Sequence, residues 1–293
     1  NPDEVIEYHK YSDPFAYMWE VHDYVEECML DPEEYEVQEH VDPQPIEHAL
    51  KIVKDSIEKT ILSVQSQVPP GTQCTPEVYL TGGSNFRTSL HTIPTVLKGG
   101  KPCHGYKGNR PKKRPHWYYE IREYLINNWN ATVVEGMEAD DKLAIEQSKA
   151  YEDIWNIPEP GVPETCIATI DKDLLNVPGA HYNMDSQLSR WVTPEEAEVN
   201  FYRQILTGDR TDNIHGCFKV GAATAAKLIY EGQTSGDKWS TVLEQYRLNM
   251  EKYPEQWITD KTPEEAALEI ARLVYMVQDE EQLLWEPPQR TAA

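Results

Sequence analysis

Residues 165–173 read TCIATIDKD, an apolar and β-branched run that ends in two aspartates. Runs of this kind are typical of strands that are buried on both faces of a parallel sheet. In open α/β sheets, ligands gather at the carboxyl ends of the strands. Residues two apart in an extended segment project to one face, so Asp171 and Asp173 could address a shared ion. An acidic turn after a strand is also common, and the pair alone decides little.

The segments before this strand alternate between the two kinds of secondary structure. Period and length predict strands at 77–81 and 131–134, and helices at 46–64, 116–129 and 140–149. This alternation predicts an α/β class, with a three-layer arrangement of a mainly parallel sheet flanked by helices.

The segments after Pro194 all have helical spacing. Helices are expected at 195–206, 222–231, 240–251 and 263–277. We therefore expect an α/β domain over residues 1–190, in which residues 1–45 are an atypical acidic segment, and a helical domain over residues 191–293.

The composition agrees with a folded protein, and its charge is unevenly distributed. The chain has 293 residues, 39% of them hydrophobic, and a net charge of −23. Such a charge opposes binding of a polyanion. Residues 98–114, however, read KGGKPCHGYKGNRPKKR, which contains many basic residues and no acidic one. This basic segment could hold nucleic acid locally, and we expect it to be a loop or irregular arm.

The cysteines and the apolar runs indicate the environment of the protein. The 5 cysteines are scattered without a C-x-x-C pair, which argues against a disulfide framework and a zinc site. This usage suits a reducing cytoplasm. No apolar run approaches the roughly 18 residues of a membrane span, so no membrane partner is expected. The chain begins with Asn1 rather than Met, which indicates processing or a fragment.

Two further groups of carboxylates lie at the ends of expected elements. Glu138, Asp140 and Asp141 open a helix, where acidic residues also suit the helix dipole without any further role. Asp209 and Asp212 lie in the segment TGDRTDNIHG at 207–216. Gathering so much negative charge is unfavourable unless cations neutralise it. Oxygen-ligated Mg²⁺ or Mn²⁺ would explain the three groups jointly, and a pair of such ions can clamp a phosphoryl displacement.

Four motifs together resemble the 5′-nuclease superfamily. This PIN-like group includes flap endonucleases, bacteriophage 5′–3′ exonucleases and the 5′-nuclease domain of bacterial DNA polymerase I. The motifs are YKGNR at 106–110, EADD at 138–141, DKD at 171–173 and GDRTDNI at 208–214. Their order and approximate spacing match over residues 78–232, and TGGSNFR at 81–87 is most similar to the phage branch.

The resemblance implies a two-metal 5′–3′ exonuclease and structure-specific endonuclease, with residues 1–190 as the catalytic domain. Lys107 and Arg110 would stabilise the scissile phosphate, a role that suits their charge and hydrogen-bond donors. The implied ligands of two Mg²⁺ or Mn²⁺ ions are Glu138, Asp140, Asp141, Asp171, Asp173, Asp209 and Asp212, with Asp13 as a further candidate.

The resemblance also implies a helix–three-turn–helix over residues 216–227, which would grip the DNA backbone and could hold K⁺ on its carbonyls. Amides exposed at a helix N-terminus favour phosphate, although such contacts carry little sequence information. An ordinary helical hairpin is the alternative. The expected DNA-binding residues are Tyr106, Asn109, Lys112, Lys113, Arg114, Gly216, Gly221, Thr224 and Lys227.

Some positions depart from the pattern of the superfamily. Its members begin with an apolar strand that delivers an aspartate, but no convincing strand precedes Asp13. Gly82 and Gly83 stand where some relatives carry another aspartate. The metal site could therefore be incomplete.

Three hypotheses follow. The first is a monomeric phage-type 5′–3′ exonuclease and flap endonuclease, acting on 5′ ends, flaps, nicks or RNA–DNA hybrids in DNA replication or host DNA degradation. The second is a catalytically weak DNA-binding protein with the same fold. The third is an Asp-x-Asp phosphatase, which the basic segment disfavours because a small substrate does not require it.

Overall fold

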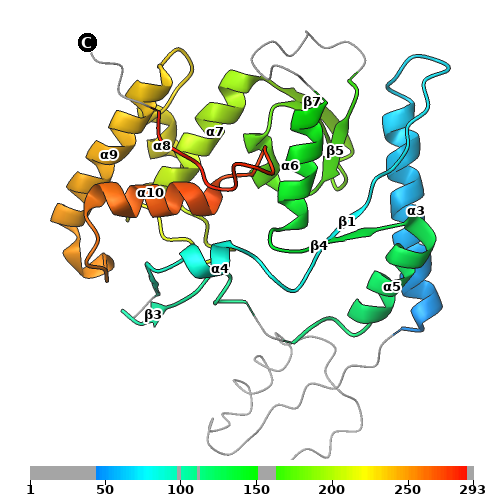
Figure 1. Ribbon diagram of the computed structural model, residues 1–293, viewed down its shortest axis with the longest axis horizontal. Coiled ribbons are helices and arrows are strands. Elements are labelled where there is room, and N and C mark those ends of the chain that lie inside the picture. The colour runs from blue at the N-terminus through cyan, green and yellow to red at the C-terminus, as the bar shows by residue number, and fades with distance from the viewer. Residues whose placement is uncertain (1–43, 98–99, 111–112, 151–162, 289–293) are drawn as a thin grey trace, which may run out of the picture. The chain divides into compact units, whose positions relative to one another are not determined.

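The computed structural model describes residues 44–97, 100–110, 113–150 and 163–288 (Figure 1). Residues Ile46–Ala293 form one compact unit. Two expected site residues, Asp13 and Lys112, lie outside the described residues, and the boundary near residue 190 stays a prediction. Within the described ranges, no helix combines the length and apolar character needed to cross a bilayer.

Parallel strand pairs form the centre of the α/β part. Strand β5 (Cys166–Thr169) pairs in parallel with β6 (Gly179–Asn183), and β7 (Leu188–Val192) adds antiparallel to β6. Strand β1 (Tyr79–Thr81) pairs in parallel with β4 (Thr132–Val134). The predicted α/β class is confirmed. Strands β6 and β7 were not among the strands predicted from periodicity.

The helices of this part cover both strand groups. Helix α6 (Ala139–Lys149) contacts β1, β4 and β5, so it joins the two groups (Figure 1). Helix α3 (Ile46–Gln65) contacts α5 (Tyr118–Trp129). Because α6 begins directly after β4, its first turn lies at the carboxyl end of that strand.

Four later helices share the main hydrophobic core. They are α7 (Pro194–Thr207), α8 (Ala222–Leu228), α9 (Ser235–Lys252) and α10 (Pro263–Val274). Helix α10 packs against α9 and α7, and α7 packs against α8. The helical region predicted after Pro194 is confirmed, whereas its helix–three-turn–helix assignment stays a prediction.

The ends of these helices differ from expectation for local reasons. Helix α9 begins at Ser235 rather than 240, because the Thr234 hydroxyl accepts a hydrogen bond from the Asp237 amide and the Asp237 carboxylate accepts one from the Thr234 amide. Helix α8 ends at Leu228 and α10 at Val274, since the residue after each is extended.

Short elements connect the larger ones. They are α4 (Arg87–Leu90), β2 (Thr95–Val96), β3 (Pro102–Cys103), and the 3₁₀ helices η2 (Lys172–Asn176) and η3 (Pro254–Gln256). Strands β2 and β3 pair antiparallel, so the basic segment is not wholly irregular as expected.

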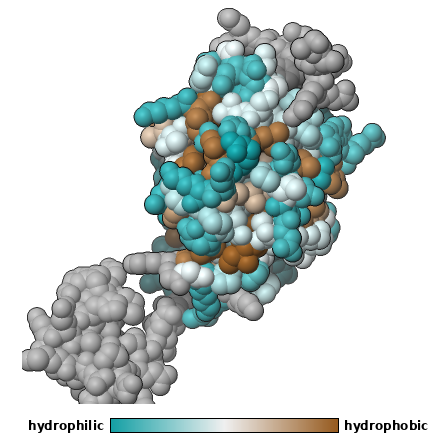
Figure 2. All heavy atoms as spheres, turned by 90° about the vertical axis from the view of Figure 1, so that its left-hand side faces the viewer, coloured by the Kyte–Doolittle hydropathy of each residue, from teal (hydrophilic) through white to brown (hydrophobic). Residues whose placement is uncertain are grey.

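One face of the molecule is shown in Figure 2, the side on which Figure 1 draws α9. Hydrophobic residues there form separate groups between hydrophilic ones. Scattered exposure of this kind is usual for a solvent-facing surface.

Candidate functional site

The turn over residues 207–216 closes on itself through two glycines. The amides of Asp209 and Ile214 donate to each other's carbonyls, at 3.0 and 2.6 Å. Gly208 has a φ of +64°, and a Cβ there would lie 2.4 Å from the Gly216 nitrogen. A Cβ on Gly216 would meet the carbonyl carbon of Thr207 at 2.2 Å. Glycine at both positions therefore permits the close backbone approach.

This turn orients its two aspartates differently. Asp209 is buried, and its Oδ1 accepts the amides of Thr211 and Asp212 at 2.6 and 3.3 Å. Such side-chain hydrogen bonds to the following backbone stabilise a turn. Asp212 instead directs its carboxylate towards residues 106–110, as the contacts below show.

Hydrogen bonds to backbone carbonyls of this turn hold residues 106–110 against it. The Lys107 amide donates to the Asp212 carbonyl at 2.9 Å. Asn109 Nδ2 donates to the Arg210 carbonyl at 2.6 Å, and Arg110 Nε donates to the Thr211 carbonyl at 3.2 Å. The expected catalytic residues are thus brought to the aspartate turn from about a hundred residues away in sequence.

Three side chains of this segment contact the carboxylates. The Tyr106 hydroxyl lies 2.6 Å from Glu138 Oε2 and 2.8 Å from Asp212 Oδ2. The Lys107 ammonium pairs with Glu138 and lies 3.6 Å from Asp212 Oδ2, and Arg110 pairs with Asp212. Burial, together with the charge of Glu138, raises the pKa of Tyr106 far above its usual value. Tyr106 is therefore a neutral hydrogen-bond donor.

The remaining carboxylates form two pairs. Burial and then the hydrogen bond to Asp209 raise the pKa of Asp173. Burial opposes ionisation of Asp209 too, but the bond to Asp173 and the amides of Thr211 and Asp212 hold the pKa of Asp209 below its usual value. The two carboxylates therefore titrate as a coupled pair, in which ionisation of one opposes ionisation of the other.

The second pair is Asp140 and Asp171. Burial, followed by the charges of Asp171 and Glu138, raises the pKa of Asp140 to about 6. Negative charge thus exceeds positive charge at this end of β5 and α6.

These residues can be tested for their fit to divalent cations. In the described part of the chain, no three His, Cys, Asp or Glu side chains converge on one point as they stand. Their chemistry nevertheless fits, because hard divalent cations prefer carboxylate oxygen. Burial and then the charges of Asp171 and Glu138 oppose ionisation of Asp140, and a bound cation would relieve both effects. The Lys107 ammonium already lies between Glu138 and Asp212.

Asp141 is engaged differently from the other expected ligands. It is fully buried, and Arg87 binds both of its oxygens, at 2.5 and 2.7 Å. Arg87, the last residue of the segment TGGSNFR at 81–87, was not among the expected site residues. Nothing in local spacing reveals the pair, because its partners are 54 residues apart.

The expected DNA-binding residues that the structure describes lie in three places. Gly221 precedes α8, and Thr224 and Lys227 are exposed on that helix. Gly216 belongs to the closed turn described above. Beyond residues 106–110, Lys113 is exposed, and the Arg114 guanidinium lies 4.8 Å from the centre of the Tyr118 ring.

The K⁺ site expected at the turn before α8 stays a prediction. The carbonyl of Cys217 accepts the Val220 amide, and that of Phe218 accepts Asn249 Nδ2. The carbonyl of Gly221 accepts two amides of α8. These hydrogen bonds fix the direction of the carbonyls in the turn, and they do not decide whether a monovalent cation binds there.

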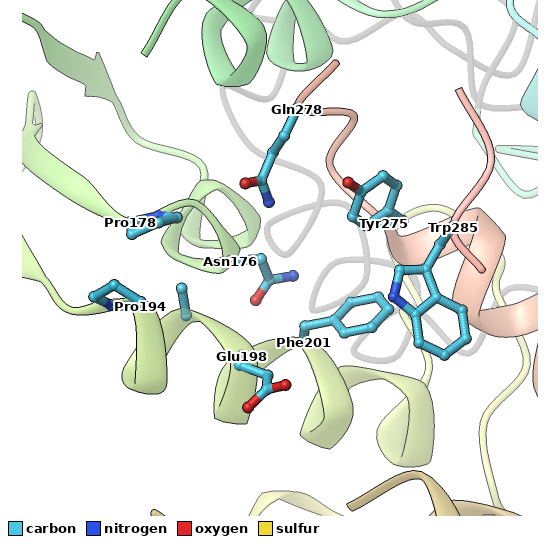
Figure 3. A pocket seen from close by; sticks show the side chains of 9 residues that line it. Asn176, Pro178, Pro194, Glu198, Phe201, Tyr275, Gln278 and Trp285 are labelled. Atoms are coloured by element: carbon cyan, nitrogen blue, oxygen red, sulfur yellow. The ribbon is translucent and has the colours of Figure 1, made fainter. Parts of the chain in front are cut away.

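A separate cavity of about 220 Å³ lies between η2, α7 and the segment after α10 (Figure 3). The rings of Phe201 and Trp285, with centres 5.3 Å apart, form one side. Glu198 also lines the cavity, and it binds Ser235 and Lys238. None of the expected site residues and no Lys or Arg is among its lining residues, so its chemistry does not suit phosphate.

Comparisons with known proteins bear on the fold. No family model matches the chain. A crystal structure of a bacteriophage T5 protein with metal ions aligns at a TM-score of 0.50 and 16% identity, over 74% of this chain and 81% of that one. The two chains therefore share a fold.

Two further T5 structures align less well. A 5′-exonuclease with bound zinc gives a TM-score of 0.49 and 17% identity, over 75% of this chain and 81% of that one. A flap endonuclease in a pseudo-enzyme–product complex with DNA and metal ions gives a TM-score of 0.47 and 14% identity, over 76% of this chain and 85% of that one.

One curated sequence matches part of the chain. DNA polymerase I of Rhizobium leguminosarum is 30% identical over 141 residues, which cover 43% of this chain and 13% of the polymerase. The chain thus spans a small part of that relative's length. The resemblance to the 5′-nuclease superfamily is confirmed at the level of the fold.

Proposed function

We propose that this protein is a divalent-metal-dependent phosphodiester hydrolase that cleaves DNA near 5′ ends. One observation carries the proposal: Lys107 and Arg110 are docked beside a cluster of carboxylates at strand and helix ends. A phosphodiester substrate needs cations on its oxygens, while carboxylates alone would repel it. The shared fold with a T5 protein crystallised with metal ions supports the same function.

The carboxylates would hold two Mg²⁺ or Mn²⁺ ions. The residues concerned are Glu138, Asp140, Asp171, Asp173, Asp209 and Asp212. When bound, such ions activate water and neutralise charge on the phosphoryl group.

The cationic side chains then become available to the substrate. Lys107 and Arg110 would move from Glu138 and Asp212 to the non-bridging oxygens of the scissile phosphate. Arg110 can bind such a group through two hydrogen bonds. Tyr106 would keep its hydroxyl on Glu138 and hold that carboxylate in place.

The DNA backbone would lie along α8 as well as along the basic segment. Gly221, Thr224 and Lys227 are exposed there and could contact phosphates without reading sequence. The substrates proposed are 5′ flaps, nicks and RNA–DNA hybrids, since recognition rests on backbone shape rather than on bases.

The test is cleavage of a 5′-labelled flap duplex in Mg²⁺, with EDTA as a control. We compare the wild type with Asp171→Asn and with Asp185→Asn, which alters an exposed carboxylate in the β6–β7 turn. The wild type and Asp185→Asn should release short 5′ products. EDTA and Asp171→Asn should abolish the release.

The same experiment distinguishes the alternatives. Among the described residues, no three carboxylates converge on one point, and this favours a second candidate, a DNA-binding protein of this fold with little activity. That candidate predicts flap binding without cleavage at any metal concentration. Hydrolysis of a small phosphate ester without DNA affinity would reject both.

A further inference from the structure

We propose that Asp141 does not ligate metal but acts with Arg87 as a buried clamp, which positions the metal-binding carboxylate of Glu138. The name Arg87–Asp141 clamp is used below for this pair. The inference rests on the proposed function, because it concerns how the metal site is held in shape.

The arginine of the clamp uses all its nitrogens. Arg87 is 1% exposed. Besides the two hydrogen bonds to Asp141, Nε donates to the Leu273 carbonyl at 2.9 Å and Nη2 to the Tyr275 carbonyl at 2.5 Å. Its Nη1 lies 3.9 Å from Glu138 Oε2. Arg87 thereby ties α4 to α6, to the last turn of α10 and to the segment after it.

The aspartate of the clamp has no acceptor site left. Its Oδ1 accepts from Arg87 and from the Val277 amide at 3.1 Å. Its Oδ2 accepts from Arg87 and from the Glu138 amide at 3.0 Å. An ionised carboxylate offers about four lone-pair sites, and all are filled. A metal ion could bind Asp141 only by displacing one of these donors, and Arg87 already neutralises its charge.

The clamp acts on the metal site through the start of α6. Glu138 and Asp141 form a capping box, in which each side chain accepts the other residue's amide. Glu138 is itself in contact with Lys107 and Tyr106. Partners that orient a ligand in this way typically change metal affinity 10- to 100-fold, roughly, when they are removed.

Mn²⁺ binding measured by calorimetry tests the clamp without any activity assay. The variants are Asp141→Asn, Arg87→Met, their combination and Arg87→Lys, with Asp171→Asn as the ligand control. We expect Asp141→Asn and Arg87→Met each to weaken Mn²⁺ binding about 10- to 100-fold. The combined variant should bind no more weakly than either, because both changes break one unit.

Arg87→Lys addresses the case in which the other variants fail to fold. It keeps the charge but cannot hold both Asp141 oxygens, so the clamp predicts weaker Mn²⁺ binding. If Asp141 is instead a metal ligand, the variants at Arg87 should bind Mn²⁺ as tightly as the wild type or more tightly. Only Asp141→Asn should then weaken Mn²⁺ binding.

The other outcomes are equally distinct. Unchanged Mn²⁺ affinity in all clamp variants, with a lower melting temperature, would show a purely structural pair and overturn the proposal. Unchanged affinity in Asp171→Asn would instead overturn the metal site itself, and with it the proposed function.

Discussion

Acid should destabilise the fold through a buried histidine next to the aspartate turn. His215 is 6% exposed, its ring lies edge-on to Trp257 with centres 4.5 Å apart, and its Nε2 has no hydrogen-bond partner among the described residues. Burial, and then the proximity of His91, lowers the pKa of His215 from 6.5 to about 4. The imidazole is therefore neutral in the folded protein at pH 5, whereas it is largely protonated in the unfolded chain.

The direction and the size of the change in folding stability follow from this difference in protonation. Because the unfolded state binds the proton more tightly, stability is complete above pH 6.5 and falls as the pH drops towards 4. The lowered pKa of His215 is worth about 3 kcal/mol of stability in full, at about 1.4 kcal/mol for each unit by which the pKa is lowered. Between pH 7 and pH 5 the expected loss from this one residue is about 2 kcal/mol.

Urea unfolding at pH 7, 6 and 5, followed by tryptophan fluorescence in EDTA, measures this loss. The variant His215→Leu keeps the apolar contact and removes the titrating group, so its stability should fall about 2 kcal/mol less than that of the wild type. His48→Gln, which alters an exposed histidine on α3, is the matched control and should follow the wild type. Parallel pH profiles for the wild type and His215→Leu would refute the reasoning.

Three further changes test other parts of the structure. Gly208→Ala should destabilise the protein by about 2 to 3 kcal/mol in urea, because its φ is +64° and a Cβ there would strike backbone; Gly71→Ala, where nothing lies within 4 Å, should cost less. Lys238→Met leaves the Glu198 carboxylate without its buried partner and should lower the stability in urea by about 3 kcal/mol. Adding Glu198→Met should restore most of this loss in the same assay. Lys107→Met should slow single-turnover flap cleavage on the order of 100-fold or more, with a much smaller change in flap affinity by fluorescence anisotropy; an equal loss in both would show that Lys107 serves binding alone.

The sequence alone determined the class of the fold and the chemistry of the candidate site. Long periodic segments such as α7 and α10 were predictable, because their apolar spacing is a local property. The carboxylates at 138–141, 171–173 and 209–212 were identifiable for the same reason, since each group lies within a few residues. Their role as metal ligands stays a proposal.

Tertiary structure decided which of these groups meet and what neutralises them. Asp141 was indistinguishable from Asp140 in sequence, yet its carboxylate is saturated by Arg87 and by the amide of Val277, 136 residues away. The role of Tyr106 in binding DNA stays a prediction, and only the tertiary structure shows that its hydroxyl contacts Glu138 and Asp212. The spacing of residues along a chain determines only which side chains lie close together on the same helix or strand. The hydrogen-bond partners of a buried charge are chosen by packing between distant segments, because an unpaired buried charge is too costly to keep.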